Sequence, residues 1–353
     1  MCRVIASMLA AMCVVFLVAC GGGGGTDSSR LFFVPEDDPA GRGEELWSTD
    51  GTAGSTTILM DINDSDGSYP GNLGKFNGLL YFTADPGSGQ VLWVSDGTAT
   101  GTTSVTDITS MFPGGVGPIS SLGNSLFFIG DDDSGRGEAL WVSNGTATGS
   151  TFIKAFDQTD SFVEYSDRLY FMADDGSGRG RELWATNGTP VGTTMIQDLN
   201  PGAGETVILS MEPYDGNLYF SVDNDTNLWV TDGSPGSINV AVDLSLVGID
   251  EEPTYLCAYD GLLYFSGSDS GNREIWYTNG TEAGTDMAFD LRSGGSSFPE
   301  WLTAYKGLLY FAADDGSGRE TELWASDGSA SGTTMVINFL PSAGSYPERL
   351  IVY

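Results

Sequence analysis

Carboxylates are the main groups in this sequence that could do chemistry. The 353 residues include 48 Asp and Glu, 14 Lys and Arg and no His, which gives a formal net charge of -34. Without an imidazole there is no His-based triad, proton shuttle or metal site. Glycoside hydrolysis by a pair of carboxylates stays open. A field of this sign repels phosphate backbones, so we expect no nucleic-acid partner.

Asp and Arg recur at fixed distances from a repeated Trp and form a candidate ligand rim. Each Asp stands ten residues before its Trp and each Arg five before. One interpretation is a polar ring for a glycan, a peptide or Ca²⁺; the other is a pair that only shapes each loop. The residues are Asp37, Arg42, Asp131, Arg136, Asp174, Arg179, Asp314 and Arg319.

Asp131 and Asp133 are the candidate Ca²⁺ ligands in this set. Together with Ser134 they offer hard oxygen donors, but the ligand spacing of a known calcium loop is absent. We therefore expect no obligatory cofactor and keep Ca²⁺ as an option.

The first cysteines of the chain lie in or beside an apolar leader. The apolar run from Val4 to Ala19 is shorter than the roughly 20 residues that a membrane-spanning helix needs, and it ends at Cys20. The sequence Leu17-Val18-Ala19-Cys20 resembles the bacterial lipobox. This resemblance implies a signal peptide at 1–19, lipidation of Cys20 and a Gly-rich tether at 20–29. Ordinary cleavage nearby and an uncleaved anchor are the alternatives.

Cys257 would then be the only free thiol of the mature chain. It lies in the apolar run Tyr255-Leu256-Cys257-Ala258-Tyr259, and no His is present to activate it. We expect a buried structural cysteine rather than a nucleophile.

The elements that would position these groups are set by a sequence repeat of 43 to 48 residues. Each repeat has a Leu-aromatic-Phe segment, then Leu or Ile before a Trp, then Asp or Asn followed by Gly. We interpret the Asp/Asn-Gly pairs as tight hairpin turns with positive φ. The repeat tryptophans, which we expect to pack between repeats, are Trp47, Trp93, Trp141, Trp184, Trp229, Trp276 and Trp324.

Four short strands per repeat, with apolar residues on both strand faces, are typical of propeller blades. We therefore predict an all-β fold, a seven-bladed β-propeller at 30–353. Its first strand (Leu31-Phe32-Phe33) and the last residues (346–353) would complete one blade and close the ring. An open β-solenoid is the alternative. The links between the second and third strands and between blades vary in length and lie on one rim, where we expect binding.

The repeat also resembles a known bacterial family named after its motif, ELWxxDGT. Residues 44–52 (Glu-Glu-Leu-Trp-Ser-Thr-Asp-Gly-Thr) carry the match, and the repeat extends from residue 30 onward. The motif Glu is kept at Glu45, Glu182 and Glu322 but replaced by Val91, Ala139 and Asn227, which argues against essential chemistry. The resemblance implies a surface or secreted protein without a settled activity.

These observations lead to one function and two alternatives. We predict a non-catalytic binding or scaffold propeller, exported and lipid-anchored to a bacterial membrane, at the outer membrane or cell surface. Its ligand would be a glycan, peptide or protein. The alternatives are a carbohydrate-active or other hydrolytic enzyme that uses paired carboxylates, and a scaffold for outer-membrane assembly.

Overall fold

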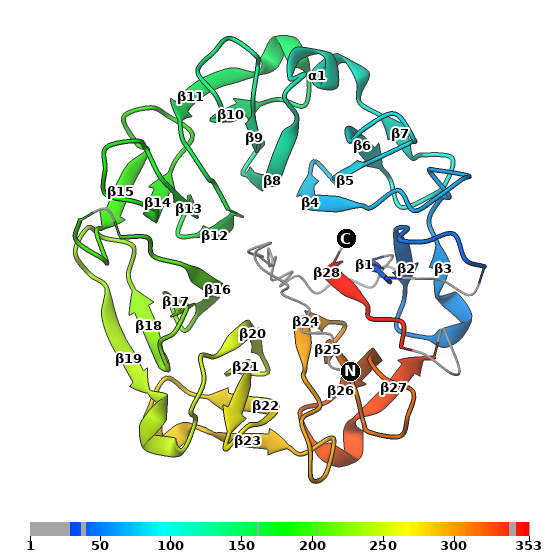
Figure 1. Cartoon of the computed structure of the whole chain (residues 1–353), viewed down its shortest axis with the longest axis vertical. Helices are drawn as coiled ribbons and strands as arrows, with labels where there is room; N and C mark the ends of the chain where they lie inside the picture. The colour runs from blue at the N-terminus through cyan, green and yellow to red at the C-terminus, as the bar shows by residue number, and fades with distance from the viewer. Residues whose placement is uncertain (1–28, 37–39, 161, 203, 339–343, 353) are drawn as a thin grey trace, which may run out of the picture.

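The computed structural model describes residues 29–36, 40–160, 162–202, 204–338 and 344–352, and the statements below concern those residues. They form seven antiparallel sheets of four strands each, arranged as blades around one axis (Figure 1). The fold is a seven-bladed β-propeller, as the repeats predict, and not an open solenoid. No helix in the described part of the chain is long and apolar enough to cross a membrane.

We number the blades along the chain and give their strands from the axis outward. Blade 1 has β28 (Glu348–Val352), β1 (Leu31–Val34), β2 (Trp47–Thr49) and β3 (Thr57–Ile58). Blade 2 has β4 (Gly71–Phe76), β5 (Leu79–Ala84), β6 (Val91–Ser95) and β7 (Thr103–Ser104). Blade 3 has β8 (Val116–Leu122), β9 (Ser125–Gly130), β10 (Ala139–Ser143) and β11 (Thr151–Ala155). Blade 4 has β12 (Val163–Tyr165), β13 (Arg168–Ala173), β14 (Glu182–Thr186) and β15 (Thr194–Gln197).

The remaining blades follow the same order. Blade 5 has β16 (Ile208–Tyr214), β17 (Asn217–Val222), β18 (Asn227–Thr231) and β19 (Asn239–Asp243). Blade 6 has β20 (Thr254–Tyr259), β21 (Leu262–Asp269), β22 (Asn272–Thr278) and β23 (Asp286–Phe289). Blade 7 has β24 (Glu300–Tyr305), β25 (Leu308–Ala313), β26 (Glu322–Ser326) and β27 (Thr334–Ile337). The helical turns are α1 (Thr106–Met111), η1 (Ala53–Ser55), η2 (Ala147–Gly149), η3 (Leu244–Val247), η4 (Glu282–Gly284) and η5 (Ala330–Gly332).

The two ends of the chain close the ring in blade 1. The C-terminal strand β28 pairs antiparallel with β1, with Leu31 opposite Val352 and Phe32 opposite Ile351. This pairing confirms the predicted closure. It leaves no blade without an inner strand, so the propeller has no open end where an extra strand could add.

The apolar core is divided among the interfaces between neighbouring blades. Phe32 and Leu46 of blade 1, for example, pack with Leu80, Phe82 and Trp93 of blade 2. The repeat tryptophans lie in such clusters, and six of them are at most 8% exposed. Trp229 is only partly buried and donates from Nε1 to Asp225 at 2.9 Å. Because both faces of each sheet are covered, the strands show little polar alternation.

The Asp/Asn-Gly segments lie in the links between the antiparallel third and fourth strands, as the predicted hairpin turns require, but these links are longer than two residues. Only the glycine has positive φ, as at Gly280 (φ 89°), and in four blades a 3₁₀ turn follows before the outer strand. The Asp or Asn instead accepts hydrogen bonds inside the turn: Asp96 Oδ1 accepts from the backbone N–H (2.9 Å) and the hydroxyl (2.6 Å) of Thr98. Two-residue turns with two positive φ values occur between the inner strands, as at Asn77-Gly78.

Candidate functional site

The aspartates of the predicted ligand rim shape their loops. Asp174 Oδ1 accepts from the backbone N–H of Gly176 at 2.8 Å, and Asp314 Oδ1 accepts from Gly316 at 2.7 Å. Asp131 does the same with Asp133 at 2.9 Å. Each such bond folds the start of the link between the second and third strands of its blade. Asp37 lies outside the described residues.

The arginines of that rim lie beside aromatic rings or at exposed loop positions. The guanidinium of Arg136 lies 4.7 Å from the ring centre of Phe152 and 5.9 Å from that of Trp141, and it forms an ion pair with Asp132 at 3.5 Å. Arg42 lies 5.9 Å from the ring centre of Trp47. Arg179 and Arg319 are exposed on their loops. In the loop of blade 3, the arginine therefore pairs with Asp132 and not with the rim aspartate Asp131.

The Ca²⁺ prediction at Asp131 and Asp133 receives no third acidic ligand. No group of three or more His, Cys, Asp or Glu side chains suited to a metal occurs among the described residues. One oxygen of Asp131 is already used by the loop. Calcium at this loop stays a prediction from the sequence.

The motif glutamates, by contrast, hold the links between blades. Glu274 is fully buried, and its carboxylate accepts from the hydroxyl (2.6 Å) and N–H (2.9 Å) of Ser297 and from the N–H of Leu291 (3.1 Å). Glu45 binds Ser68 in the same way at 2.6 and 3.0 Å. Glu322 accepts from Ser345 at 2.6 Å. We call each of these Glu–Ser contacts a clasp; it ties the start of the next inner strand to the blade before it.

Blades without the motif Glu use apolar side chains for the same purpose. After β7, where Val91 replaces Glu, helix α1 buries Ile108 and is followed by buried Phe112. After β19, where Asn227 replaces Glu, the link buries Leu244 and Ile249. The residue at the motif position therefore depends on how the following link is stabilised, by a buried carboxylate or by apolar side chains. This structural role agrees with the replacement of the Glu in several repeats.

The three Glu–Ser clasps present aromatic side chains on one rim. The residue after each clasp serine is Tyr69, Phe298 or Tyr346, and each is followed by a proline. Their exposed fractions are 47%, 55% and 37%, which make them the exposed aromatics of the described chain. Each stands two residues before an inner strand, β4, β24 or β28, and these strands belong to blades 2, 7 and 1, which are neighbours around the ring (Figure 1). We call these three residues the aromatic arc.

The backbone of the arc is fixed in a strained conformation. Tyr69, Phe298 and Tyr346 have φ of 50°, 47° and 44°, a region that bulky residues rarely occupy. Each N–H donates to the carbonyl of the residue before a motif position, as from Phe298 to Arg273 at 3.3 Å. Strain of this kind costs on the order of 1–3 kcal/mol per residue and tends to persist at functional sites.

Two further acids lie beside the arc on the inner strands. Glu300 of β24 and Glu348 of β28 occupy equivalent positions after the prolines. Burial raises the pKa of Glu300 to about 7; the Glu348 carboxylate adds to the rise, and Arg273 opposes it. Burial likewise raises the pKa of Glu348. Tyr255 packs near Trp301, with ring centres 5.8 Å apart and ring planes tilted by 45°.

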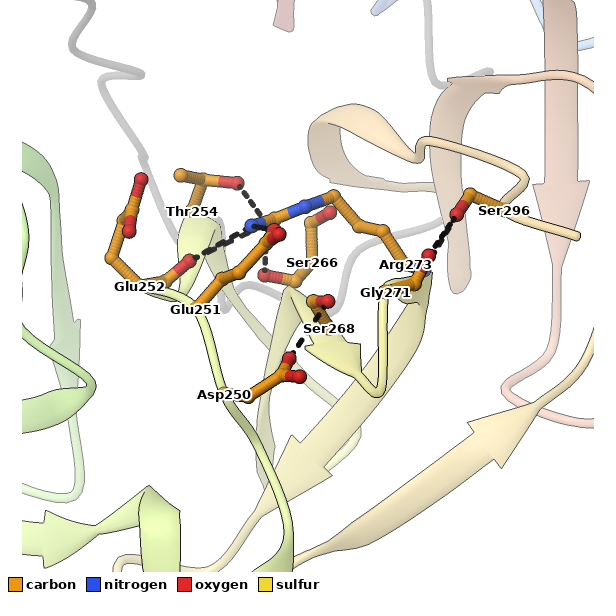
Figure 2. Close-up of polar contacts among 9 residues, drawn as sticks. All are labelled: Asp250, Glu251, Glu252, Thr254, Ser266, Ser268, Gly271, Arg273 and Ser296. Atoms are coloured by element: carbon orange, nitrogen blue, oxygen red, sulfur yellow. Dashed lines mark hydrogen bonds and ion pairs between the residues drawn. The ribbon is translucent and has the colours of Figure 1, made fainter.

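Arg273 organises the neighbouring loop of blade 6. Its guanidinium pairs with Glu251 at 2.6 Å and donates to the carbonyls of Ser266 (3.2 Å) and Glu252 (3.4 Å) (Figure 2). Nearby, Ser268 donates to Asp250 at 3.0 Å. Because its donors are taken up by its own blade, Arg273 sets the position of Thr254 and the start of β20 rather than offering a free cation.

The ligand rim stays a prediction from the sequence, and sequence reasoning did not single out the aromatic arc. The parallel between Phe298-Pro299-Glu300 and Tyr346-Pro347-Glu348 is visible in the sequence, and Tyr69-Pro70 shares it. An aromatic before a proline at the start of an inner strand was the available signal. These aromatics are exposed because the backbone at each clasp has a positive φ. The sequence does not reveal this conformation.

Cys257 is a free thiol in the interior. It is fully buried, and burial raises its pKa well above the usual range, with the Glu212 carboxylate acting in the same direction. A thiol held protonated in this way is a poor nucleophile. The expected structural cysteine agrees with this environment.

Comparisons with known proteins show the fold and no closer relationship. No protein-family model matches the chain, and no curated protein matches it. Among solved structures, prolyl oligopeptidase B from Galerina marginata has 12% sequence identity and a TM-score of 0.58, with 88% of this chain and 51% of that chain covered. A prolyl endopeptidase structure has 13% identity and a TM-score of 0.58, with 87% and 48% covered.

A third similar structure belongs to another peptidase. Acylaminoacyl peptidase from Pyrococcus horikoshii has 10% identity and a TM-score of 0.55, with 88% of this chain and 51% of that chain covered. This chain therefore spans about half the length of each of these three peptidases. At such low identity the likeness concerns the propeller fold alone.

Proposed function

We propose that this chain is an exported, lipid-anchored binding protein without catalytic activity, and that the aromatic arc binds a neutral or amino-bearing glycan. The observation that carries the proposal is the arc itself: Tyr69, Phe298 and Tyr346 are exposed on consecutive blades and held there by buried clasps. Rigid aromatic side chains lose little conformational entropy on binding.

The chemistry of the arc suits a chain of sugar rings. A pyranose ring has an apolar face of C–H groups, which packs on the electron-rich face of an aromatic ring. Its hydroxyls donate to carboxylates, and such charge-assisted hydrogen bonds are strong. Acceptors stand beside the arc: Tyr346 already donates to Glu320 at 2.6 Å, and Glu300 and Glu348 follow on the same strands.

The charge of the rim selects among glycans. Acidic side chains near the arc include Glu36, Glu44 and Glu320, and the whole chain has a formal charge of -34. This field disfavours sulfated or uronic-acid polymers and favours neutral or amino-bearing ones.

Affinity electrophoresis of the propeller region through gels that contain neutral polysaccharides, including partly deacetylated chitin, tests the proposal. We expect retardation that is lost in the triple variant Tyr69→Ala, Phe298→Ala, Tyr346→Ala. The matched control replaces exposed apolar residues elsewhere, Val191, Val240 and Leu246, by Ala. Equal retardation of the arc variant and the control would reject the arc as the binding site.

The membrane anchor and the family are part of the same proposal. The leader that ends at Cys20 lies outside the described residues, and it supports export and lipidation by sequence alone. The clasps explain why a motif Glu recurs before Leu-Trp, which supports membership of the ELWxxDGT family. The location that we propose is the outer membrane or the cell surface.

Glycoside hydrolysis is a second candidate, favoured by one observation. Glu300 has a pKa of about 7 and stands beside a second buried carboxylate, Glu348, as expected of a general acid paired with a base or nucleophile. Release of reducing ends from the retained polysaccharide, abolished by Glu300→Gln with binding intact, would establish this activity. If no reducing ends are released, the protein binds the polysaccharide without hydrolysing it.

A further inference from the structure

The chain enters the propeller at the end of the ring that lies opposite the aromatic arc. Leu31, the first residue of β1, pairs with Val352, the last residue of β28. Ser29 stands two residues before β1, and Tyr346 stands two residues before β28. Because the two strands are antiparallel, Ser29 and Tyr346 lie at opposite ends of blade 1.

A contact that recurs between blades holds Ser29 at its end of the ring. The inner strands of blades 4, 5 and 6 end in a tyrosine whose hydroxyl donates to the carbonyl of a turn glycine in the next blade. These bonds join Tyr165 to Gly216 (2.7 Å), Tyr214 to Gly261 (2.9 Å) and Tyr259 to Gly307 (2.9 Å). In blade 7 the hydroxyl of Tyr305 donates to the carbonyl of Ser29. Ser29 thus takes the place of a turn glycine, four residues before the Phe of the second strand, as Gly216 does.

The two ends of the ring can now be told apart. We call the end with these inner turns and Ser29 the turn rim, and the end with the arc the arc rim. Arg30 also belongs to the turn rim, since its guanidinium donates to the carbonyl of Ser55 (3.4 Å) between β2 and β3. The sequence that leads back to Cys20 therefore leaves the propeller from the rim that the arc does not occupy.

The length of that sequence limits how the propeller can lie on a membrane. Ser29 follows Cys20 by nine residues, which span at most about 30 Å when fully extended. To reach the arc rim, the segment would have to cross β2 and β3, at about 5 Å per strand, and then follow the length of a five-residue strand such as β28, about 17 Å. This path of roughly 27 Å takes up nearly the full extension before the loops of the arc rim are passed.

We propose that the turn rim faces the bilayer that holds the lipid on Cys20, and that the aromatic arc faces away from it. This inference rests on the lipid anchor and the glycan site of the proposed function. It assigns the source of the glycan, which is a polysaccharide outside that bilayer and not the sugar headgroup of a glycolipid within it. Aromatic side chains that lay against the bilayer would instead act as interfacial anchors, a common place for Tyr.

Energy transfer from two labelled positions of blade 2 to the lipid surface tests this orientation. The full lipidated chain is placed in phosphatidylcholine vesicles whose headgroups carry an acceptor dye. Ala99→Cys puts a donor dye on the exposed turn after β6, at the turn rim. Ser88→Cys puts it on the exposed link before β6, at the arc rim. Cys257 is fully buried and the lipid blocks the thiol of Cys20, so labelling is directed to the introduced cysteine.

We expect transfer from the Ala99→Cys label to exceed transfer from the Ser88→Cys label by at least about twofold, because β6 and its turns separate the two positions by roughly 20 Å. The matched control inserts about twenty Gly and Ser residues after Gly25, which gives either rim enough length to reach the bilayer. In that control the two labels should give equal transfer.

Equal transfer from the two labels without the insertion, or greater transfer from Ser88→Cys, would overturn the orientation. Flotation of the vesicles separates this result from a failure of the anchor. A chain that does not float with the vesicles has no lipid anchor, and the proposed orientation is then wrong as well.

Binding of soluble, partly deacetylated chitin fragments tests the source of the glycan. The chain on vesicles should bind them as the detached Cys20→Ala chain does, and a glucosylated lipid in the same vesicles should not compete. Loss of binding on vesicles, or competition by the glucosylated lipid, would show that the arc faces the bilayer and would overturn the proposal. If neither form binds the fragments, the glycan site is rejected, and the transfer measurement alone decides the orientation.

Discussion

At the scale of single residues, the motif Glu works as a structural acceptor. A fully buried carboxylate is costly unless several donors surround it. Glu274 has the Ser297 hydroxyl and the N–H groups of Ser297 and Leu291 around it, and burial still raises its pKa. The serine in turn uses its carbonyl to accept from Asp314 at 2.9 Å. The Glu274 carboxylate thus fixes the backbone around Ser297, where the chain enters blade 7.

Replacing this carboxylate should cost stability rather than chemistry. Glu274→Ala leaves the donors of Ser297 and Leu291 buried without an acceptor, at about 1–3 kcal/mol for each group that stays unpaired. We expect a loss on the order of 3–5 kcal/mol in urea unfolding, with Glu274→Gln intermediate. Asp64→Ala, an exposed acid on an interblade link, is the control. A loss below that of the control would show that the clasp does not stabilise the fold.

The sequence predicted the buried residues that hold the blades together better than it predicted the candidate binding site. Trp141 and its equivalents recur in every repeat, each after Leu or Ile, and a large buried side chain at a fixed repeat position has few other uses. Asp131 and Arg136 also recur, in four of the seven repeats, yet one accepts a hydrogen bond within a turn and the other lies over aromatic rings. Regular recurrence therefore marked structure in both cases. The arc departs from the repeat, because only some links carry an aromatic before proline.

At the scale of elements, strand order followed from the sequence and turn geometry did not. Each strand pair is set by short apolar segments and by the length of the link between them. The Asp/Asn-Gly pair is a common hairpin signal, but here the glycine is also required by packing. A Cβ at Gly280 would lie 2.8 Å from the hydroxyl of Tyr219 in the preceding blade. That contact between blades is invisible in a single repeat.

The closing strand gives the element-scale prediction. Deleting residues 346–353 removes β28, exposes the edge of β1 and uncovers Leu350 and Ile351 contacts in two core clusters. We expect a loss of several kcal/mol, since each buried Leu or Ile side chain contributes about 1.5–3 kcal/mol. Thermal unfolding measures it. A melting temperature close to that of the intact chain would mean that closure contributes little.

At the scale of the whole molecule, attachment to a membrane is predicted to depend on one atom. The lipobox-like sequence Leu17-Val18-Ala19-Cys20 predicts that the lipid on the Cys20 thiol is the anchor. Several acyl chains, at about 0.8 kcal/mol per buried CH₂, are enough for stable attachment. We expect Cys20→Ala to shift the protein from the membrane pellet to the soluble fraction. A variant that still pellets after a high-salt wash would contradict lipid anchoring.

Buried carboxyl groups make the stability of the protein fall as pH rises. The pKa of Glu45 is raised by burial to about 6 and that of Glu300 to about 7, from an ordinary value of 4.5. A carboxyl whose folded pKa is raised favours the folded state below its unfolded pKa, and this contribution is lost as pH rises through the folded pKa. Both groups therefore destabilise the propeller between pH 5 and 8 as pH increases, in the same sense as the net repulsion among 48 acids.

Urea unfolding at a series of pH values, with a chelator present to keep Ca²⁺ out, measures this dependence. We expect the free energy of unfolding to fall by on the order of 3 kcal/mol from pH 5 to pH 8. Below about pH 4 the trend should reverse, because turn hydrogen bonds lower the pKa of Asp96 and Asp327, whose contribution is lost on protonation. The variant Glu300→Gln should flatten the slope near pH 7 specifically, whereas Asp64→Ala should not. A stability that rises from pH 5 to pH 8 would mean that these carboxylates are ionised and well compensated in the folded ring.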